Sequence, residues 1–242
     1  MYQPKFYRFW IKETELKSFE VIISQSDLLI QAEKNLQKKA HKILLKYRKI
    51  LEKYISNHPD FLTTLKPYPL EQSQPEIVKE MIKFSTIVDV GPMASVAGAI
   101  AEFVGKELLK FSKQIIIENG GDIFLKIAKP RTVGIYAGKS PLSGKIGIEI
   151  KPEETPLGIS TSSGTVGHSL SFGKADAVVV ISKSAILADA CATASANLIQ
   201  NEDDLIKAID FAKKIKGIQG ILAIKNDKLA LWGKIKIKRI YC

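Results

Sequence analysis

Residues 188–197 read Ala-Asp-Ala-Cys-Ala-Thr-Ala-Ser-Ala-Asn, and this alanine-rich stretch is typical of a buried helix. Asp189, Thr193 and Asn197 recur every four residues, so they would line one face of that helix. A carboxylate on an otherwise apolar face needs a partner. Either a nearby backbone or basic group satisfies Asp189, or Asp189 binds a hard cation, to which Thr193 would add a hydroxyl oxygen.

A second helix with a smooth face is expected over residues 93–111. Its small residues recur at four-residue intervals, at Ala97, Ala101 and Gly105. Such a face lets a backbone, a sheet or a flat ligand approach closely. The preceding segment 89–95 contains Gly91 and Met93, and the free N–H groups at a helix start favour an anion. The alternative is that Gly91 belongs to a turn that separates two helices.

Two further segments are polar and rich in glycine. Residues 118–122 read Glu-Asn-Gly-Gly-Asp, which is the chemistry of a hairpin turn. A functional interpretation requires Gly120 and Gly121 to let a ligand approach the backbone while Asn119 or Asp122 bonds to it. This segment therefore predicts a turn, with a ligand contact as the second possibility.

Residues 161–173 contain six hydroxyls, three glycines and one of the chain's three histidines. Hydroxyls and exposed N–H groups in a glycine-rich loop can bind phosphate oxygens without a fixed positive charge. The same composition is also compatible with a surface loop. His168 is the best candidate for a general acid or base, because the other two histidines lie in a lysine-rich helix and in a turn.

The remaining pattern predicts an α+β fold with two pseudo-repeats of antiparallel strands and packed helices in one domain, residues 1–242. We expect two or three strands within 5–31, a helix over 32–56 and another from Pro75. Further strands are expected at 114–118, 123–128, 132–137, 146–150 and 177–181, with a polar loop before the last. Helices at 185–199 and 202–214 and a terminal hairpin at 220–241 complete the chain. A two-domain chain divided within the proline-rich stretch 67–75 is the alternative.

Composition limits the function classes. The chain has 242 residues, 45% hydrophobic and 25% charged, and no apolar run long enough for a membrane span, so we expect no membrane association. Two isolated cysteines indicate a reduced, cytoplasmic protein. The net charge of +11 invites a nucleic-acid interpretation, but the lysines are spread over helix faces, and an anionic small molecule fits them better.

Together these segments resemble the FAD:protein FMN transferase superfamily, the ApbE-like proteins, and most closely a shorter branch of it. The resemblance covers about residues 85–200, and the Ala-Asp-Ala-x-Ala-Thr motif at 188–193 is its most specific part. It implies an ApbE-like, T-fold-like domain that binds FAD or FMN with Mg²⁺. It also implies that FMN is transferred from FAD to a Ser or Thr of an acceptor protein. A module that binds a flavin or another nucleotide without catalysis is the alternative.

Carried over residue by residue, the resemblance implies that the metal ligands are Asp189, Thr193 and the carbonyl of Ala94. His168 would take the proton of the acceptor hydroxyl. The nucleotide would contact residues of all three glycine-rich segments, namely Gly91, Met93, Asn119, Gly120, Gly121, Asp122, Thr161, Ser162, Ser163 and Gly164. The sequence departs from the superfamily in the first motif helix, where Ser95 and Ile100 stand in place of a lysine and an aspartate.

Overall fold

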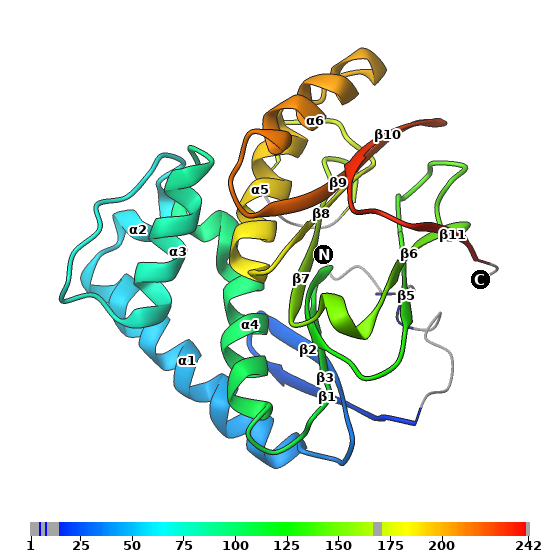
Figure 1. Cartoon of the computed structure of the whole chain (residues 1–242). Coiled ribbons are helices and arrows are strands. Elements are labelled where there is room, and N and C mark those ends of the chain that lie inside the picture. Colours follow the sequence, from blue (N-terminus) through cyan, green and yellow to red (C-terminus); the bar gives the residue numbers. More distant parts are fainter. Residues whose placement is uncertain (1–4, 6–7, 9–14, 167–170, 241–242) are drawn as a thin grey trace.

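The computed structural model describes residues 5, 8, 15–166 and 171–240, which form three layers. The middle layer is an antiparallel sheet of eight strands in the order β1-β2-β3-β4-β7-β8-β9-β10. Helices cover one face of this sheet, and a three-stranded sheet, β11-β6-β5, lies on the other side (Figure 1). The expected α+β class is confirmed.

The large sheet contains two similar halves joined where β4 pairs with β7. The first half holds β1 (Lys17–Ile23), β2 (Ser26–Ala32), β3 (Ile115–Asn119) and β4 (Asp122–Lys126). The second holds β7 (Leu157–Ser162), β8 (Ala177–Ser182), β9 (Ile218–Lys225) and β10 (Lys228–Gly233). In each half the helices enter between the second and third strands, so the topology has the expected pseudo-repeat.

The helices of the first half are α1 (Gln37–Asn57), α2 (Asp60–Thr63), α3 (Glu76–Ile87), the 3₁₀ turn η2 (Pro92–Ser95) and α4 (Val96–Leu108). The second half has α5 (Ala185–Asn197), the 3₁₀ turn η4 (Glu202–Asp204) and α6 (Leu205–Lys213). Both α4 and α5 are buried along most of their length, as their small residues predict. Together they lie between the sheet and the outer helices α1 and α3 (Figure 1).

The small sheet is built from β5 (Arg131–Gly134), β6 (Ile146–Ile150) and β11 (Ile237–Arg239), and a 3₁₀ turn η3 (Pro152–Glu154) follows β6. The side of the large sheet away from the helices packs on this small sheet through a separate apolar cluster. Strand β8 is buried at all six positions, because alternate residues face the helices and the small sheet. Its unbroken apolar run follows from this position.

Three element predictions are corrected by the structure. Helix α1 begins at Gln37 and not at residue 32, because Ala32 is still paired in β2, with Lys17 on one side and Ile115 on the other. The expected polar loop contains strand β7, which pairs with β4 and β8. Strand β11 leaves the terminal hairpin and pairs with β6. Of the first expected strand, near residues 6–11, most lies outside the described residues.

Within the described residues, no single helix is long and apolar enough to cross a membrane. One pair of segments, Glu76–Ile87 with Pro92–Leu108, meets the length and composition requirement only when the two are taken together, and they are bent by 101°.

Candidate functional site

Helices α4 and α5 cross at Gly98, where their backbones touch. A Cβ atom at Gly98 would overlap the carbonyl oxygen of Ala185 and the Cβ of Asp189. Further along α4, a Cβ at Gly105 would overlap the ring of Phe124 on β4. The smooth face of α4 is therefore used for close packing against another helix and against the sheet.

The crossing brings two buried carboxylates onto helix N-termini. Asp189 of α5 accepts the N–H of Gly98, in the first turn of α4, at 2.8 Å. Glu102 of α4 accepts the N–H groups of Ala185 and Ile186, at the start of α5, at 2.7 and 3.3 Å, and the hydroxyl of Ser184 at 2.9 Å. Each helix thus caps the other with a carboxylate, which satisfies unpaired amides and complements the helix dipole.

Asp189 therefore has the backbone partner that one of the two sequence interpretations required. Its environment still disfavours the charge. Burial raises the pKa of the Asp189 carboxyl to about 7, although the N–H groups of Gly98 and Ala97 partly offset this effect. A carboxylate that is desolvated and held by neutral donors retains the capacity to bind a cation.

The segment 119–122 forms the expected hairpin turn between β3 and β4. Gly120 and Gly121 adopt φ of +68° and +107°, which other residues rarely do, and Asn119 pairs with Asp122 across the turn. The side-chain amide of Asn119 donates to the carbonyl of Ala97 at 3.1 Å. The turn therefore lies against the start of α4, beside the Asp189 contact.

Asp122 enters the same buried region. Burial, the negative charge of Asp189 and that of Glu118 raise the pKa of Asp122 well above its usual value, while a hydrogen bond from Ser160 opposes the shift. Two carboxylates that influence each other in this way form one electrostatic unit. The structure thus joins the second and fourth sequence segments.

The third segment is divided by the structure. Thr161 and Ser162 are the last residues of β7, and a Cβ at Gly121 would lie 3.5 Å from the carbonyl oxygen of Thr161, in ordinary contact. This part of the segment lies beside the 119–122 turn. The hydroxyl-rich stretch therefore begins at the C-terminal end of β7, an inner strand of the large sheet, beside the 119–122 turn.

The following residues are held by a different neighbour. Ser163 accepts the N–H groups of Thr165 and Val166 at 3.1 and 3.0 Å, and the N–H of Gly164 donates to the carbonyl of Ala175 at 2.9 Å. Gly164 packs against the backbone of Gly173. The backbone N–H groups of Gly164, Thr165 and Val166, which could have bound a phosphate, are thus engaged within the chain. His168 lies outside the described residues.

The three expected metal ligands are placed on adjoining elements. The hydroxyl of Thr193 lies 3.5 Å from the carbonyl oxygen of Ala94, and Asp189 is one turn earlier on the same face of α5. Carboxylate, hydroxyl and carbonyl oxygens are hard donors of the kind that bind Mg²⁺. Within the described ranges, no group of three or more His, Cys, Asp or Glu residues could hold a metal ion. A cation here would depend on mixed oxygen donors.

Gly91 and Met93 are explained by packing. A Cβ at Gly91 would overlap the carbonyl of Thr64, in the connection between α2 and α3, so this glycine allows that connection to pass. Met93 is partly buried against the core of the first half. Neither position shows a direct link to the carboxylates at the α4–α5 crossing.

Two residues at the site were not identified from the sequence, Glu102 and Ser160. One signal was available for Glu102, because it is a lone carboxylate on a helix of small and apolar residues, like Asp189. No comparable signal exists for Ser160, whose role depends on the unexpected strand β7.

A family model and several related proteins match most of this chain. The family model described as AbpE bacteria matches residues 8–217. A UPF0280 protein of Methanocaldococcus jannaschii is 46% identical over 221 residues, which cover 89% of this chain and 90% of that protein. A UPF0280 protein of Methanococcus aeolicus is 45% identical over 201 residues, which cover 81% of each chain.

Solved structures share the fold at low sequence identity. The apo form of the flavinyl transferase ApbE of Pseudomonas stutzeri superposes with a TM-score of 0.60 and 14% identity, covering 90% of this chain and 93% of that one. The flavin transferase ApbE from Vibrio cholerae gives a TM-score of 0.59 at 14% identity, covering 90% and 96%.

The paired half-sheets, the crossed helices and these matches define a protein of the ApbE-like superfamily. The chain belongs to the family described as AbpE bacteria, and its relatives carry the name UPF0280.

Proposed function

We propose that this protein binds a flavin nucleotide together with a divalent cation, and that it transfers FMN from FAD to a Ser or Thr of an acceptor protein. One observation carries the proposal. Parts of all four sequence segments meet around the α4–α5 crossing, at the carboxylates of Asp189 and Asp122. The matched solved structures are named as flavin transferases, which supports the flavin as ligand.

The residues that would hold the cation are Asp189, Thr193 and the carbonyl of Ala94, because all three offer hard oxygen donors on adjoining elements. A bound Mg²⁺ would neutralise charge on a diphosphate. Thr161 and the 119–122 turn would contact the nucleotide from the ends of the inner strands β3, β4 and β7. Burial raises the pKa of Asp189 to about 7, so the carboxyl alone is only partly ionised at neutral pH. A bound cation would favour the ionised form.

In the proposed transfer, the acceptor hydroxyl oxygen attacks the phosphorus of the FMN half of FAD. A new P–O bond forms, the pyrophosphate P–O bond breaks, and AMP leaves with the electron pair. His168 is proposed to accept the proton of the hydroxyl. The diphosphate and the acceptor would be oriented by the site, which converts a bimolecular step into one between positioned groups.

A non-catalytic flavin-binding or nucleotide-binding module is the second candidate, and one observation favours it. Ser95 and Ile100 replace the lysine and aspartate that the resemblance assigns to transferases. Ser95 is fully buried with its hydroxyl on the carbonyl of Pro92 at 2.8 Å, and Ile100 is part of the core. These two positions therefore present no charge to a ligand.

The test is incubation of the purified protein with FAD, with Mg²⁺ or with EDTA, in the presence of a lysate fraction as acceptor source. A transferase releases AMP only with Mg²⁺ and leaves flavin covalently attached to a protein. Bound flavin without AMP identifies the module. A result with no bound flavin and no AMP would overturn both candidates. Asp189→Asn is the matched control, since it deletes the charge and keeps the size.

A further inference from the structure

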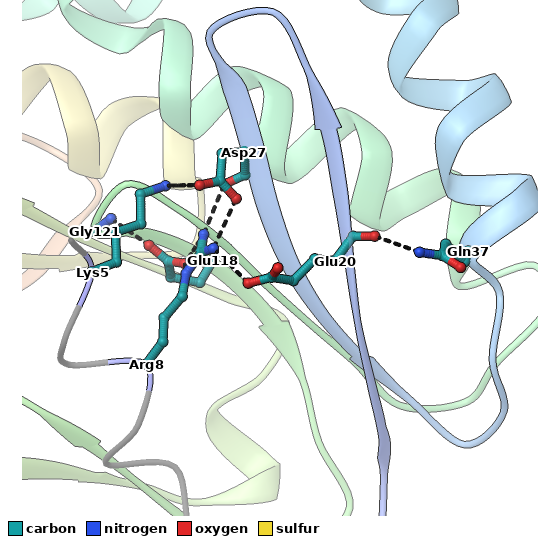
Figure 2. A network of polar contacts seen from close by, with 7 residues as sticks. All are labelled: Lys5, Arg8, Glu20, Asp27, Gln37, Glu118 and Gly121. Carbon is teal, nitrogen blue, oxygen red and sulfur yellow. Dashed lines mark hydrogen bonds and ion pairs between the residues drawn. The ribbon is translucent and has the colours of Figure 1, made fainter. Parts of the chain in front are cut away.

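Arg8 joins three strands of the large sheet through acidic side chains (Figure 2). Its guanidinium forms ion pairs with Glu20 of β1 at 3.1 Å, Asp27 of β2 at 2.7 Å and Glu118 of β3 at 2.6 Å. The Arg8 side chain is only 10% exposed. Burial disfavours its charge, but the carboxylates of Glu118 and Asp27 more than compensate and raise its pKa. Arg8 is therefore a firmly held cation.

Glu118 connects this cation to the hairpin turn. One carboxylate oxygen of Glu118 accepts the Nε–H of Arg8 at 2.7 Å, and the other accepts the backbone N–H of Gly121 at 2.9 Å. Gly121 has a left-handed backbone, with φ of +107°. Glycine already permits this conformation, and the hydrogen bonds through Glu118 link the turn to the Arg8 cation and restrict its movement.

The 119–122 hairpin turn also contacts the candidate site. Asn119 donates to the carbonyl of Ala97 in the first turn of α4, next to the amide that binds Asp189. Glu118 also adds negative charge near Asp122. Removing Arg8 would take away the charge-assisted contacts that orient the Glu118 carboxylate, so the carboxylate would be held less firmly in its present position. A change in its position would weaken the bond to Gly121.

We propose that Arg8 is a positioning residue for the candidate nucleotide site: it orients Glu118, and Glu118 fixes the Gly120–Gly121 turn beside Asp122 and the start of α4. This inference rests on the proposed function. It predicts that the Arg8–Glu118 contact and nucleotide affinity are coupled, although Arg8 itself does not touch the nucleotide. Loss of Arg8 should therefore weaken binding without removing any nucleotide contact.

A merely structural role for Arg8 is the alternative, since the same ion pairs connect β1, β2 and β3. Arg48 of α1 offers a matched comparison. Its side chain is 13% exposed, close to that of Arg8, and it bonds to Ser26, Gln25 and Glu52. None of these partners belongs to the candidate site. A general loss of stability would appear in both variants, whereas a loss of positioning would appear only at Arg8.

The experiment compares Arg8→Met with Arg48→Met in the full chain. Backbone amide exchange of Gly121 is measured by NMR, and FAD affinity is measured with Mg²⁺ by flavin fluorescence. We expect Arg8→Met to speed Gly121 exchange and to weaken FAD binding, each by about five- to tenfold, while Arg48→Met changes neither. Glu118→Gln keeps one oxygen acceptor and should give intermediate values. If Arg8→Met does not fold, Arg8→Lys, which keeps the cation without the forked guanidinium, carries the same test.

Unchanged Gly121 exchange in a folded Arg8 variant overturns the inference. Faster exchange with unchanged FAD affinity also overturns it, because the turn would then not belong to the nucleotide site. A wild-type protein that binds no FAD overturns the proposed function and, with it, the coupling to nucleotide. The Gly121 exchange comparison would in that case still decide separately whether Arg8 holds the turn.

Discussion

At the scale of single residues, Asp189 has one role that the structure shows, as a helix cap, and one that we propose, as a metal ligand. Its carboxylate accepts the N–H of Gly98 and so caps α4, and it lies one turn from Thr193 on the face that approaches Ala94. A helix cap needs only an acceptor oxygen, whereas a cation site needs the negative charge. Substitutions that separate size from charge therefore distinguish the two roles.

Asp189→Asn retains an oxygen that can accept from Gly98, so we expect the variant to fold. Mg²⁺-dependent nucleotide affinity should fall by about tenfold or more, which corresponds to about 1.4 kcal/mol. Melting temperature and nucleotide dissociation constant are measured on the same sample, with Asp189→Ala as the harsher control. A lower melting temperature with unchanged affinity per folded molecule would leave Asp189 as a cap and exclude it as a metal ligand.

At the scale of elements, the crossing of α4 and α5 is stabilised from both sides. Asp189 of α5 binds the first turn of α4, and Glu102 of α4 binds the first turn of α5. The close approach at Gly98 makes this exchange possible, because it brings each N-terminus within reach of the other helix. The two helices are therefore expected to lose stability together.

Glu102→Gln tests this exchange of caps. The amide keeps one acceptor but loses the charge that binds Ala185, Ile186 and Ser184, so we expect the free energy of unfolding to fall by about 1–3 kcal/mol. Chemical denaturation measures the change. Glu107→Gln, on the same helix and paired with Lys110, is the control and should cost less than about 0.5 kcal/mol. Equal effects at the two positions would contradict the capping role.

The start of α6 provides a pH-dependent element. Lys207 and the N–H groups of Gln200 and Asn201 lower the pKa of Asp204 from 3.8 to about 2. Because the folded-state pKa lies below the unfolded value, ionised Asp204 stabilises the fold above pH 3.8. This contribution is lost as the pH falls toward about 2.

We therefore expect Asp204→Asn to lower the melting temperature at pH 7 and to have progressively less effect between pH 4 and pH 2. Thermal unfolding of both proteins across this range gives the difference directly. A difference that stays constant down to pH 2 would mean that the charge of Asp204 does not contribute.

At the scale of the whole molecule, the two halves are joined through the sheet and through the apolar cluster of the first half. The large sheet is continuous across the β4–β7 pair, and Ala185 and Ile186 of the second half pack in the apolar cluster of the first. The proline-rich connection also packs on the first half. Gln74 donates to the hydroxyl of Tyr54 at 2.9 Å, and Thr64 packs against Gly91. We propose that residues 1–242 form one domain.

A single domain predicts one cooperative unfolding transition. Calorimetry should give one peak whose calorimetric and van 't Hoff enthalpies agree. Circular dichroism and tryptophan fluorescence should follow the same midpoint. Two resolved transitions, or a stable fragment ending near residue 75, would favour the two-domain alternative.

Elements with a strong local pattern were predictable, and those that depend on distant partners were not. The smooth helices α4 and α5 and the 119–122 turn follow from residue types within a few positions of one another. Strand β7 was missed because its hydroxyl-rich end resembles a loop, and only its pairing with β4 and β8 makes it a strand. Ala32 was placed in a helix because nothing nearby marks its pairing with Ile115.

The sequence by itself determined the class of fold, the helices with small residues and the polar stripe on α5, because spacing along a helix or strand decides which face a side chain occupies. Only the tertiary structure decided which groups meet. Asp189 and Gly98 are 91 residues apart, Glu102 and Ala185 are 83 apart, and Arg8 and Glu118 are 110 apart. Such contacts depend on strand register and helix crossing, and these are set by the packing of the whole core and not by any local pattern.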